Sequence, residues 1–198
     1  MEVSDAILKR RSIRKFDNRE IPKQTIEIIL AAAMKAPSAK NRQPWKFIIV
    51  TDKEKQGIIE AMQNGIEKEK IRQGLLPNYP NLIKGAEYSM NIMEQAPVTI
   101  FVFNTERGIL WNEASVEQKF FDIANLQSIG AAIENMLLKA TDLGIGSLWI
   151  CDIFFAYREL CDYFNSPNEL IAAVSLGYAD ENPKARPRKK FDDIVEWR

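Results

Sequence analysis

A cluster of cationic side chains near the N-terminus is the first place where this sequence could do chemistry. Residues 9–15 contain five Lys or Arg side chains, and Ser12 interrupts them. Arg offers phosphate a planar fork of donors, and Ser adds a neutral donor. We therefore predict a phosphate cradle around Arg10, Ser12 and Arg14. The alternative is a solvated helix end whose cations complement the helix dipole.

The loop at residues 36–45 is the second place. Small side chains at 37–39 let the backbone approach a planar ligand, and the amides of Asn41 and Gln43 supply paired donors and acceptors. Such groups can recognise an imide-like edge. The loop is thus a candidate ligand contact, with an ordinary helix-to-strand turn as the alternative.

A basic strip near the C-terminus is the third place. Residues 183–190 hold five Lys or Arg side chains and two prolines, and the apolar Phe191, Ile194 and Trp197 follow. A disordered basic tail with weak nucleic-acid contact is one interpretation. The apolar residues instead predict that the end is docked, which would make the strip a second phosphate contact.

The composition excludes several kinds of catalytic site. The chain contains no histidine, so a Ser-His-Asp triad, a His-based zinc site and a histidine general base are ruled out. Cys151 and Cys161 are too few for a disulfide framework or a four-thiolate metal site, and we expect both to be buried. Chemistry must come from carboxylates, a hydroxyl, a thiol or a bound cofactor.

Charge and hydropathy limit the partners and the location. Lys+Arg and Asp+Glu are equal at 27 each, which makes nucleic acid and anionic membrane poor partners. No apolar run reaches the ~18 residues that span a bilayer. Residues 1–5 show no signal-peptide core. We expect a cytoplasmic protein.

Hydrophobic periodicity predicts helices and strands interspersed along one domain, residues 1–198, with an excursion at 65–95 and a C-terminal extension at 182–198. This pattern favours an α+β or α/β layered domain. The centre of a long helix at 115–143 is apolar on more than one side, so its own domain or a second subunit should bury it. The other expected helices are a short one capped by Ser4, one with Pro22 in its first position, 53–72 and 157–164. The expected strands are 45–50, 98–103, 147–151 and 170–176.

Four segments, in order, resemble the nitroreductase family, and the resemblance covers roughly residues 4–198. They are Arg10 to Phe16, residues 37–45, Leu143 to Ile150 after the long apolar helix, and Leu176-Gly177-Tyr178 before the basic tail. One such match would be weak, whereas four in register identify the chain as similar to this family.

The resemblance implies a fold and a set of cofactor-binding residues. The fold is α+β, a nitroreductase-like three-layer sandwich whose mainly antiparallel sheet is flanked by helices. The assembly is an intertwined homodimer with two FMN sites at the subunit interface. The implied cofactor-binding residues are Arg10, Arg11, Ser12, Arg14, Pro37, Ser38, Ala39, Asn41, Leu148, Trp149, Ile150, Cys151, Arg186 and Arg188.

Each part of this set has an implied role. Arg10, Ser12 and the two tail arginines would hold the phosphate and ribityl end, and Arg14 would lie near the pyrimidine edge, where it would stabilise the reduced, anionic flavin. Residues 37–41 would come from the other subunit, and 148–151 would offer backbone N–H near flavin N5. No metal and no catalytic side chain are implied, because FMN carries the hydride chemistry.

The implied activity is transfer of electrons from NADH or NADPH, through FMN, to nitroaromatic, quinone or related acceptors by a ping-pong mechanism. The same fold and cofactor could instead serve reductive dehalogenation or oxygen-dependent flavin chemistry. A nucleic-acid-binding module is disfavoured by the zero net charge. Glu134 departs from the family, which often has glutamine there. Aromatic residues that could line a substrate pocket, or equally belong to the core, are Phe103, Trp111, Phe120 and Phe121.

Overall fold

The computed structural model describes residues 1–76, 79–106 and 114–198, and an antiparallel sheet lies at its centre. The strands of this sheet are β1 (Trp45–Thr51), β2 (Val98–Asn104), β3 (Gly146–Ile150) and β4 (Glu169–Gly177). Their spatial order is β1-β2-β4-β3, so β1 and β3 are the edges. Every neighbouring pair is antiparallel.

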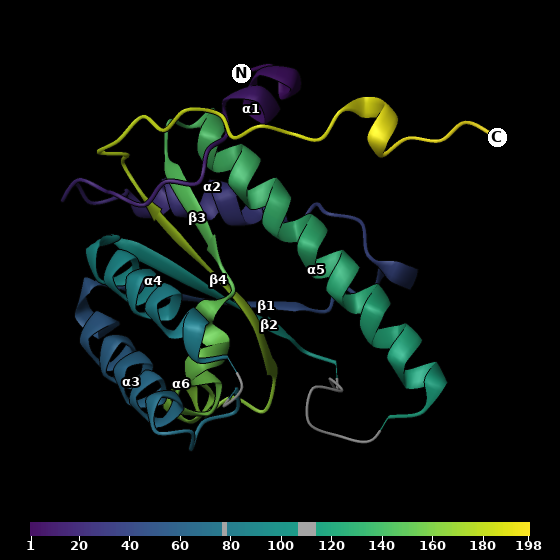
Figure 1. Ribbon diagram of the computed structural model, residues 1–198. Coiled ribbons are helices and arrows are strands. Elements are labelled where there is room, and N and C mark those ends of the chain that lie inside the picture. The colour runs from purple at the N-terminus through teal and green to yellow at the C-terminus, as the bar shows by residue number, and fades with distance from the viewer. Residues whose placement is uncertain (77–78, 107–113) are drawn as a thin grey trace.

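Helices cover both faces of the sheet, as Figure 1 shows. Helices α2 and α5 lie on one face, and α3, α4 and α6 lie on the other. The result is the expected α+β three-layer sandwich. The α-helices are α1 (Val3–Lys9), α2 (Lys23–Ala33), α3 (Asp52–Lys70), α4 (Ile83–Gln95), α5 (Val116–Asp142) and α6 (Tyr157–Phe164). The short 3-10 turns are η1 (Ala39–Asn41), η2 (Pro80–Leu82), η3 (Asp152–Ala156) and η4 (Phe191–Asp193).

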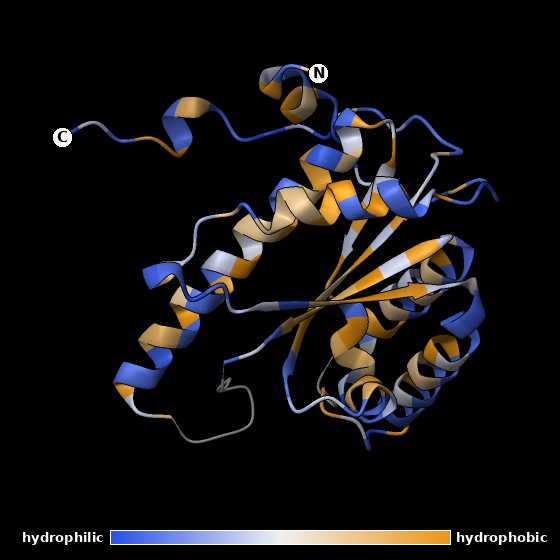
Figure 2. Ribbon diagram, turned by 180° about the vertical axis from the view of Figure 1, so that it is seen from behind, coloured by the Kyte–Doolittle hydropathy of each residue, from blue (hydrophilic) through white to orange (hydrophobic). Residues whose placement is uncertain are grey.

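Strand β2 is buried along its whole length because helices cover both of its faces. Val98, Ile100 and Val102 face the layer of α2 and α5. Phe101 and Phe103 alternate with them and face α3, α4 and α6. The apolar colour in Figure 2 gathers on the strands and on the helix sides that face them. Each such side chain contributes about 1.5–3 kcal/mol on leaving water.

Helix α5 confirms the expected long helix, and both of its ends are defined by local chemistry. Ser115 and Gln118 form a capping box at the start. At the other end Gly144 has a φ of 74°, which favours glycine. The Gly144 N–H donates to Thr141 O at 3.1 Å and the Ile145 N–H donates to Ala140 O at 2.8 Å, a Schellman closure. In the described part of the chain, no helix is apolar and long enough to cross a membrane.

Three sequence expectations need correction. The region 65–95 is not an excursion throughout: its second part is α4, and Ala86, Ile92 and Met93 are buried in the core. Residues 65–70, at its start, belong to α3. Glu2 rather than Ser4 precedes the first helix, which starts at Val3.

The third correction concerns the C-terminal extension, which is not docked within this chain. Phe191, Ile194 and Trp197 are 60%, 64% and 86% exposed. Figure 1 shows this segment leading away from the body of the protein. The described residues of this chain therefore leave exposed the apolar side chains that were expected to hold the end in place.

Candidate functional site

The cationic N-terminal segment lies along the outer edge of β3. The Ile13 N–H donates to Ser147 O at 2.9 Å, and Ser12 forms a parallel bridge with Ser147. Phe16 bridges Ala179 just beyond β4. An edge strand has backbone groups without a partner strand, and this segment donates a hydrogen bond to one of them, the Ser147 carbonyl. Residues 10–16 are thereby placed beside Ser147, which residues 148–151 directly follow in the chain.

The rest of the β3 edge stays available to a ligand. The Ser147 backbone oxygen accepts the hydrogen bond from Ile13 on the side away from β4. In an antiparallel strand the backbone N–H and C=O groups of successive residues point alternately to the two sides of the strand. The N–H groups of Trp149 and Cys151 therefore point to the same outer side as Ser147. Leu148 and Ile150 are buried, whereas Trp149 is 38% exposed.

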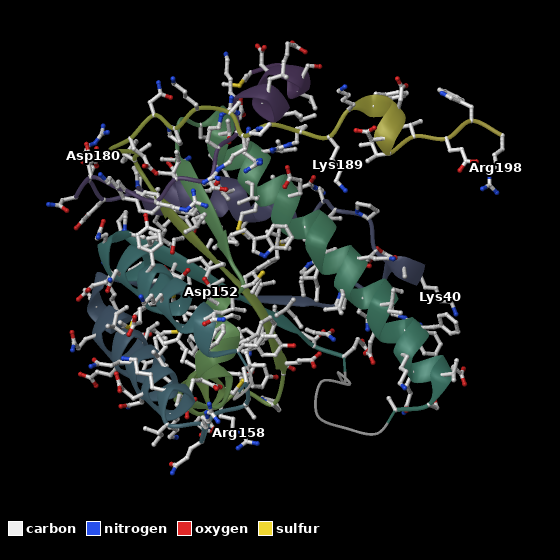
Figure 3. The ribbon with its side chains drawn as sticks, viewed as in Figure 1. Lys40, Asp152, Arg158, Asp180, Lys189 and Arg198 are labelled. Atoms are coloured by element: carbon white, nitrogen blue, oxygen red, sulfur yellow. The ribbon has the colours of Figure 1, made fainter. Side chains whose placement is uncertain are left out.

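Cys151 is exposed, which corrects the expectation that both cysteines are buried. It follows the last residue of an edge strand, so its position, not its residue type, determines its exposure. Cys161 is half-buried, and burial raises the pKa of its thiol. Directly after Cys151, the Ser89 hydroxyl donates to Asp152 Oδ2 at 2.5 Å, which ties α4 to the end of β3. Asp152 is marked at this junction in Figure 3. Sequence reasoning missed this tie, because the two residues are 63 positions apart.

The cradle contains acids as well as cations. Arg10 Nε lies 3.7 Å from Glu134 Oε1 on α5. The Arg14 backbone N–H donates to Glu181 Oε1 at 2.5 Å, and Arg14 Nη1 donates to Ser12 O at 3.2 Å. The positive charge of Arg10 is therefore partly balanced by Glu134, whereas Glu181 contacts the backbone of Arg14 and not its guanidinium. Glu181 was not anticipated, since nothing in the sequence pairs it with Arg14.

Arg11 differs from its neighbours. Its Nη1 donates to Leu8 O at 2.7 Å and to Arg10 O at 2.8 Å. These carbonyls end α1, so the guanidinium satisfies acceptors at the helix C-terminus. The helix-end interpretation of the cationic run thus describes Arg11. The Arg10 guanidinium lies near Glu134, and the Arg14 guanidinium donates to Ser12 O.

Ser147 adds a buried polar atom to this edge. The residue is 2% exposed, and its Oγ has no hydrogen-bond partner among the described residues. Buried hydroxyls are almost always bonded, so an unpartnered one needs an explanation. It lies next to Ser12, where the phosphate cradle is expected. The only sequence signal for it was a serine inside an apolar strand.

The loop at 37–43 has a strained backbone. Lys40, Asn41 and Gln43 have φ values of 54°, 54° and 52°. Each such residue costs about 1–3 kcal/mol, and such conformations cluster at functional sites. The Gln43 N–H donates to Ser38 Oγ at 3.0 Å, which braces the turn. A plain helix-to-strand turn would not need this strain.

Within one chain this loop does not meet the cradle. The Ala39 N–H donates to Ser128 Oγ on α5 at 3.3 Å, while Arg10 pairs with Glu134 on the same helix. Ser128 and Glu134 are separated by about 9 Å along the helix axis and about 120° around it. Figure 3 shows Lys40 beside the half of α5 that is farther from α1. Pro37, Ser38, Ala39 and Asn41 therefore cannot share a pocket with Arg10 unless a second chain supplies one of the two parts.

Among the described residues, the tail arginines form no hydrogen bond or ion pair with the cradle. Arg186 and Arg188 are exposed, and Arg188 Nη1 donates to Arg186 O at 3.2 Å and to Pro187 O at 3.4 Å. Lys189 and Arg198, labelled in Figure 3, lie on the segment that leaves the body of the protein. These guanidinium groups are free to meet an anion on another chain.

The aromatic residues considered for a substrate pocket separate into different environments. Phe103 is fully buried and lies edge-on to Phe164, with ring centroids 5.5 Å apart, so it belongs to the core. Phe120 is 68% exposed. Phe121 lies under the Arg42 guanidinium, which is 4.4 Å from its ring centroid. Trp111 lies outside the described residues.

Comparison with solved structures defines the class of this fold. A BluB-like flavoprotein from Clostridium difficile has a TM-score of 0.73 and 27% identity, covering 100% of this chain and 99% of that one. A nitroreductase-like protein from Bacillus cereus has a TM-score of 0.74 at 18% identity, covering 100% and 96%. The sandwich is thus a nitroreductase-like fold.

Comparison of the sequence identifies the family. The nitroreductase family model matches residues 7–178. A Methanothermobacter thermautotrophicus protein, provisionally named NADH dehydrogenase/NAD(P)H nitroreductase, is 33% identical over 195 residues, covering 94% of this chain and 82% of that protein. An iodotyrosine deiodinase from Thermotoga neapolitana is 28% identical over 191 residues, covering 94% and 93%. The chain belongs to the nitroreductase family, and the protein is an oxidoreductase.

Proposed function

We propose that the protein binds FMN and transfers electrons from NADH or NADPH to nitroaromatic, quinone or related small-molecule acceptors. The observation that carries this proposal is the docking of the cationic segment along the outer edge of β3 through Ile13 and Ser147. Guanidinium groups for an anion and outward backbone N–H groups for a planar ring converge there. The unpartnered Ser147 Oγ supports a ligand at the same edge.

The residues fit FMN in chemical type. Arg10 and Ser12 would bind its phosphate and ribityl end, and Arg14 would lie near its pyrimidine edge. Backbone N–H groups of 148–151 would orient the ring near N5, with Trp149 and Cys151 directed outward. When bound, FMN supplies the hydride chemistry. The chain's own contribution is to bind the cofactor, orient it and place positive charge beside it.

The proposed function includes a homodimer, in which the partner supplies the loop 37–41 and the tail arginines. Exposed apolar residues on α5 support it: Val116 is 70% exposed, Phe120 68%, Ile123 50% and Leu126 43%. Their spacing places them in one stripe along the helix. A contiguous apolar stripe is typical of an interface.

The oligomeric state can be measured by light scattering after size-exclusion chromatography. Ile123→Glu should give a monomer with weakened FMN binding, because a buried unpaired carboxylate is costly. Ile71→Glu is a matched control, since Ile71 is 63% exposed on another part of the surface. A monomeric wild-type protein that binds FMN fully would contradict the shared site.

Flavin binding and reduction test the function directly. The purified protein should be yellow or should take up FMN, and NADH or NADPH should bleach it under anaerobic conditions. Nitroaromatic and quinone acceptors should restore the colour. Parallel double-reciprocal lines would support the ping-pong order. A protein that cannot take up FMN would overturn the proposal.

Reductive dehalogenation is a second candidate, because the Thermotoga neapolitana relative is an iodotyrosine deiodinase that this chain covers to 93%. Release of iodide from iodotyrosine by the reduced protein, with no such release by the oxidised protein, would favour it. Oxygen-dependent flavin chemistry is distinguished by the same anaerobic assays, since only that reaction should stop when oxygen is removed.

A further inference from the structure

Glu134 on α5 directs a carboxylate at the cationic cradle. Its Oε1 lies 3.7 Å from Arg10 Nε, and the Glu134 and Arg10 side chains are 47% and 23% exposed. We propose that Glu134 determines how strongly the protein prefers FMN over riboflavin, by placing a negative charge beside the site of the FMN phosphate. This inference rests on the proposed function.

The geometry allows Arg10 to meet both groups. The ion pair uses Nε, and among the described residues the two terminal amino groups of Arg10 have no hydrogen-bond partner. These amino groups can donate hydrogen bonds to a phosphate oxygen while Nε stays near the carboxylate. Glu134 then lies about 7 Å from a doubly charged phosphate, given the span of one guanidinium.

Repulsion at this distance is modest but selective. Two like charges about 7 Å apart near a surface interact weakly, because water and salt screen them. The phosphate carries two charges, so the expected effect on FMN affinity is about three- to tenfold. Riboflavin lacks the phosphate, so the charge of Glu134 should not change the affinity for riboflavin. Glu181 faces the same segment, but its Oε1 is engaged by the Arg14 N–H.

Glu134→Gln isolates the charge. Glutamine keeps the length of the side chain and an oxygen that can accept a bond from Arg10. Glu60→Gln is the matched control, because Glu60 is an exposed acid on α3, on the opposite face of the sheet from α5. Its carboxylate accepts only from Gln56 Nε2 among the described contacts.

The test is equilibrium binding of FMN and of riboflavin to the full-length protein, followed by flavin fluorescence. Glu134→Gln should bind FMN about three- to tenfold more tightly than wild type and riboflavin within about twofold. The gain should shrink near 1 M salt, where the screening length is about 3 Å. Glu60→Gln should change neither affinity.

The other outcomes overturn the inference in distinguishable ways. Weaker or unchanged FMN binding by Glu134→Gln would show that Glu134 orients Arg10 or has no role. An equal gain for both flavins would show an effect on the protein rather than on the phosphate. If the wild type binds neither flavin, the proposed function fails together with the inference.

Discussion

Replacing Arg10 with alanine tests the central contact of the proposed cofactor site. Arg10 is the C-cap residue of α1, and its guanidinium lies 3.7 Å from Glu134 on α5. In the proposed function it forms a charge-assisted bond with the FMN phosphate. Its removal should weaken FMN binding and leave riboflavin binding almost unchanged.

The magnitude follows from what Arg10 does in this structure. A hydrogen bond to a charged group is worth about 1.5–3 kcal/mol, which corresponds to about a 10- to 150-fold rise in the FMN dissociation constant. The ion pair with Glu134 is 3.7 Å long and partly exposed, so it contributes about 0–1 kcal/mol to folding. Arg10→Ala should therefore fold normally, and a large loss of FMN affinity would be a direct effect.

The assay is flavin titration of the wild type, Arg10→Ala and Arg19→Ala, with urea unfolding of each. Arg19 is a matched control because it is 66% exposed, lies 2.6 Å from Asp17 and is close in sequence. FMN binding by Arg10→Ala within twofold of the wild type would refute the assignment of Arg10 to the phosphate. An equal loss of FMN and riboflavin would refute it as well.

Three further predictions concern the surrounding structure. Gly177→Ala should lower the unfolding free energy by about 1–3 kcal/mol in urea titrations, because a Cβ there would lie 2.6 Å from Phe16 Cδ1. Gly85→Ala is the control and should not destabilise the protein, because a Cβ at Gly85 meets nothing within 4 Å. Equal effects of the two substitutions would refute the packing argument. Burial raises the pKa of the Asp122 carboxyl above 3.8, so the folded state holds this proton more tightly and loses stability as pH rises through the raised value. Asp122→Asn should therefore gain stability relative to wild type between pH 4 and pH 7, and a pH-independent difference would contradict this. Cys151→Ser should keep FMN binding and NADH-dependent bleaching within about twofold if the backbone N–H is the contact; a tenfold loss would assign a role to the thiol.

The sequence predicted the elements of this fold well where the pattern was long and local. The helix at 115–143 was marked by its apolar centre and by Gly144, and both features depend on neighbouring residues only. The strands at 98–103 and 170–176 were recognised because they are continuous apolar runs between turn signals. Helix α4 was missed because Pro77 and Pro80 before it and Gly85 in its first turn indicated irregular chain. Tertiary packing of Ala86 and Met93 stabilises the helix.

In the candidate site too, the residue types follow from the sequence, whereas their contacts follow from tertiary packing. The amino-acid sequence specifies which groups are available: a cationic run, a small-residue loop and a basic tail, with no histidine to act as a base. Which of these groups come into contact depends on the folded chain. It placed the Ser12 segment on the edge of β3, turned Arg11 back onto α1 and brought Glu134 to Arg10. These contacts join residues that are distant in sequence, and they depend on strand order and helix packing, which no local pattern encodes.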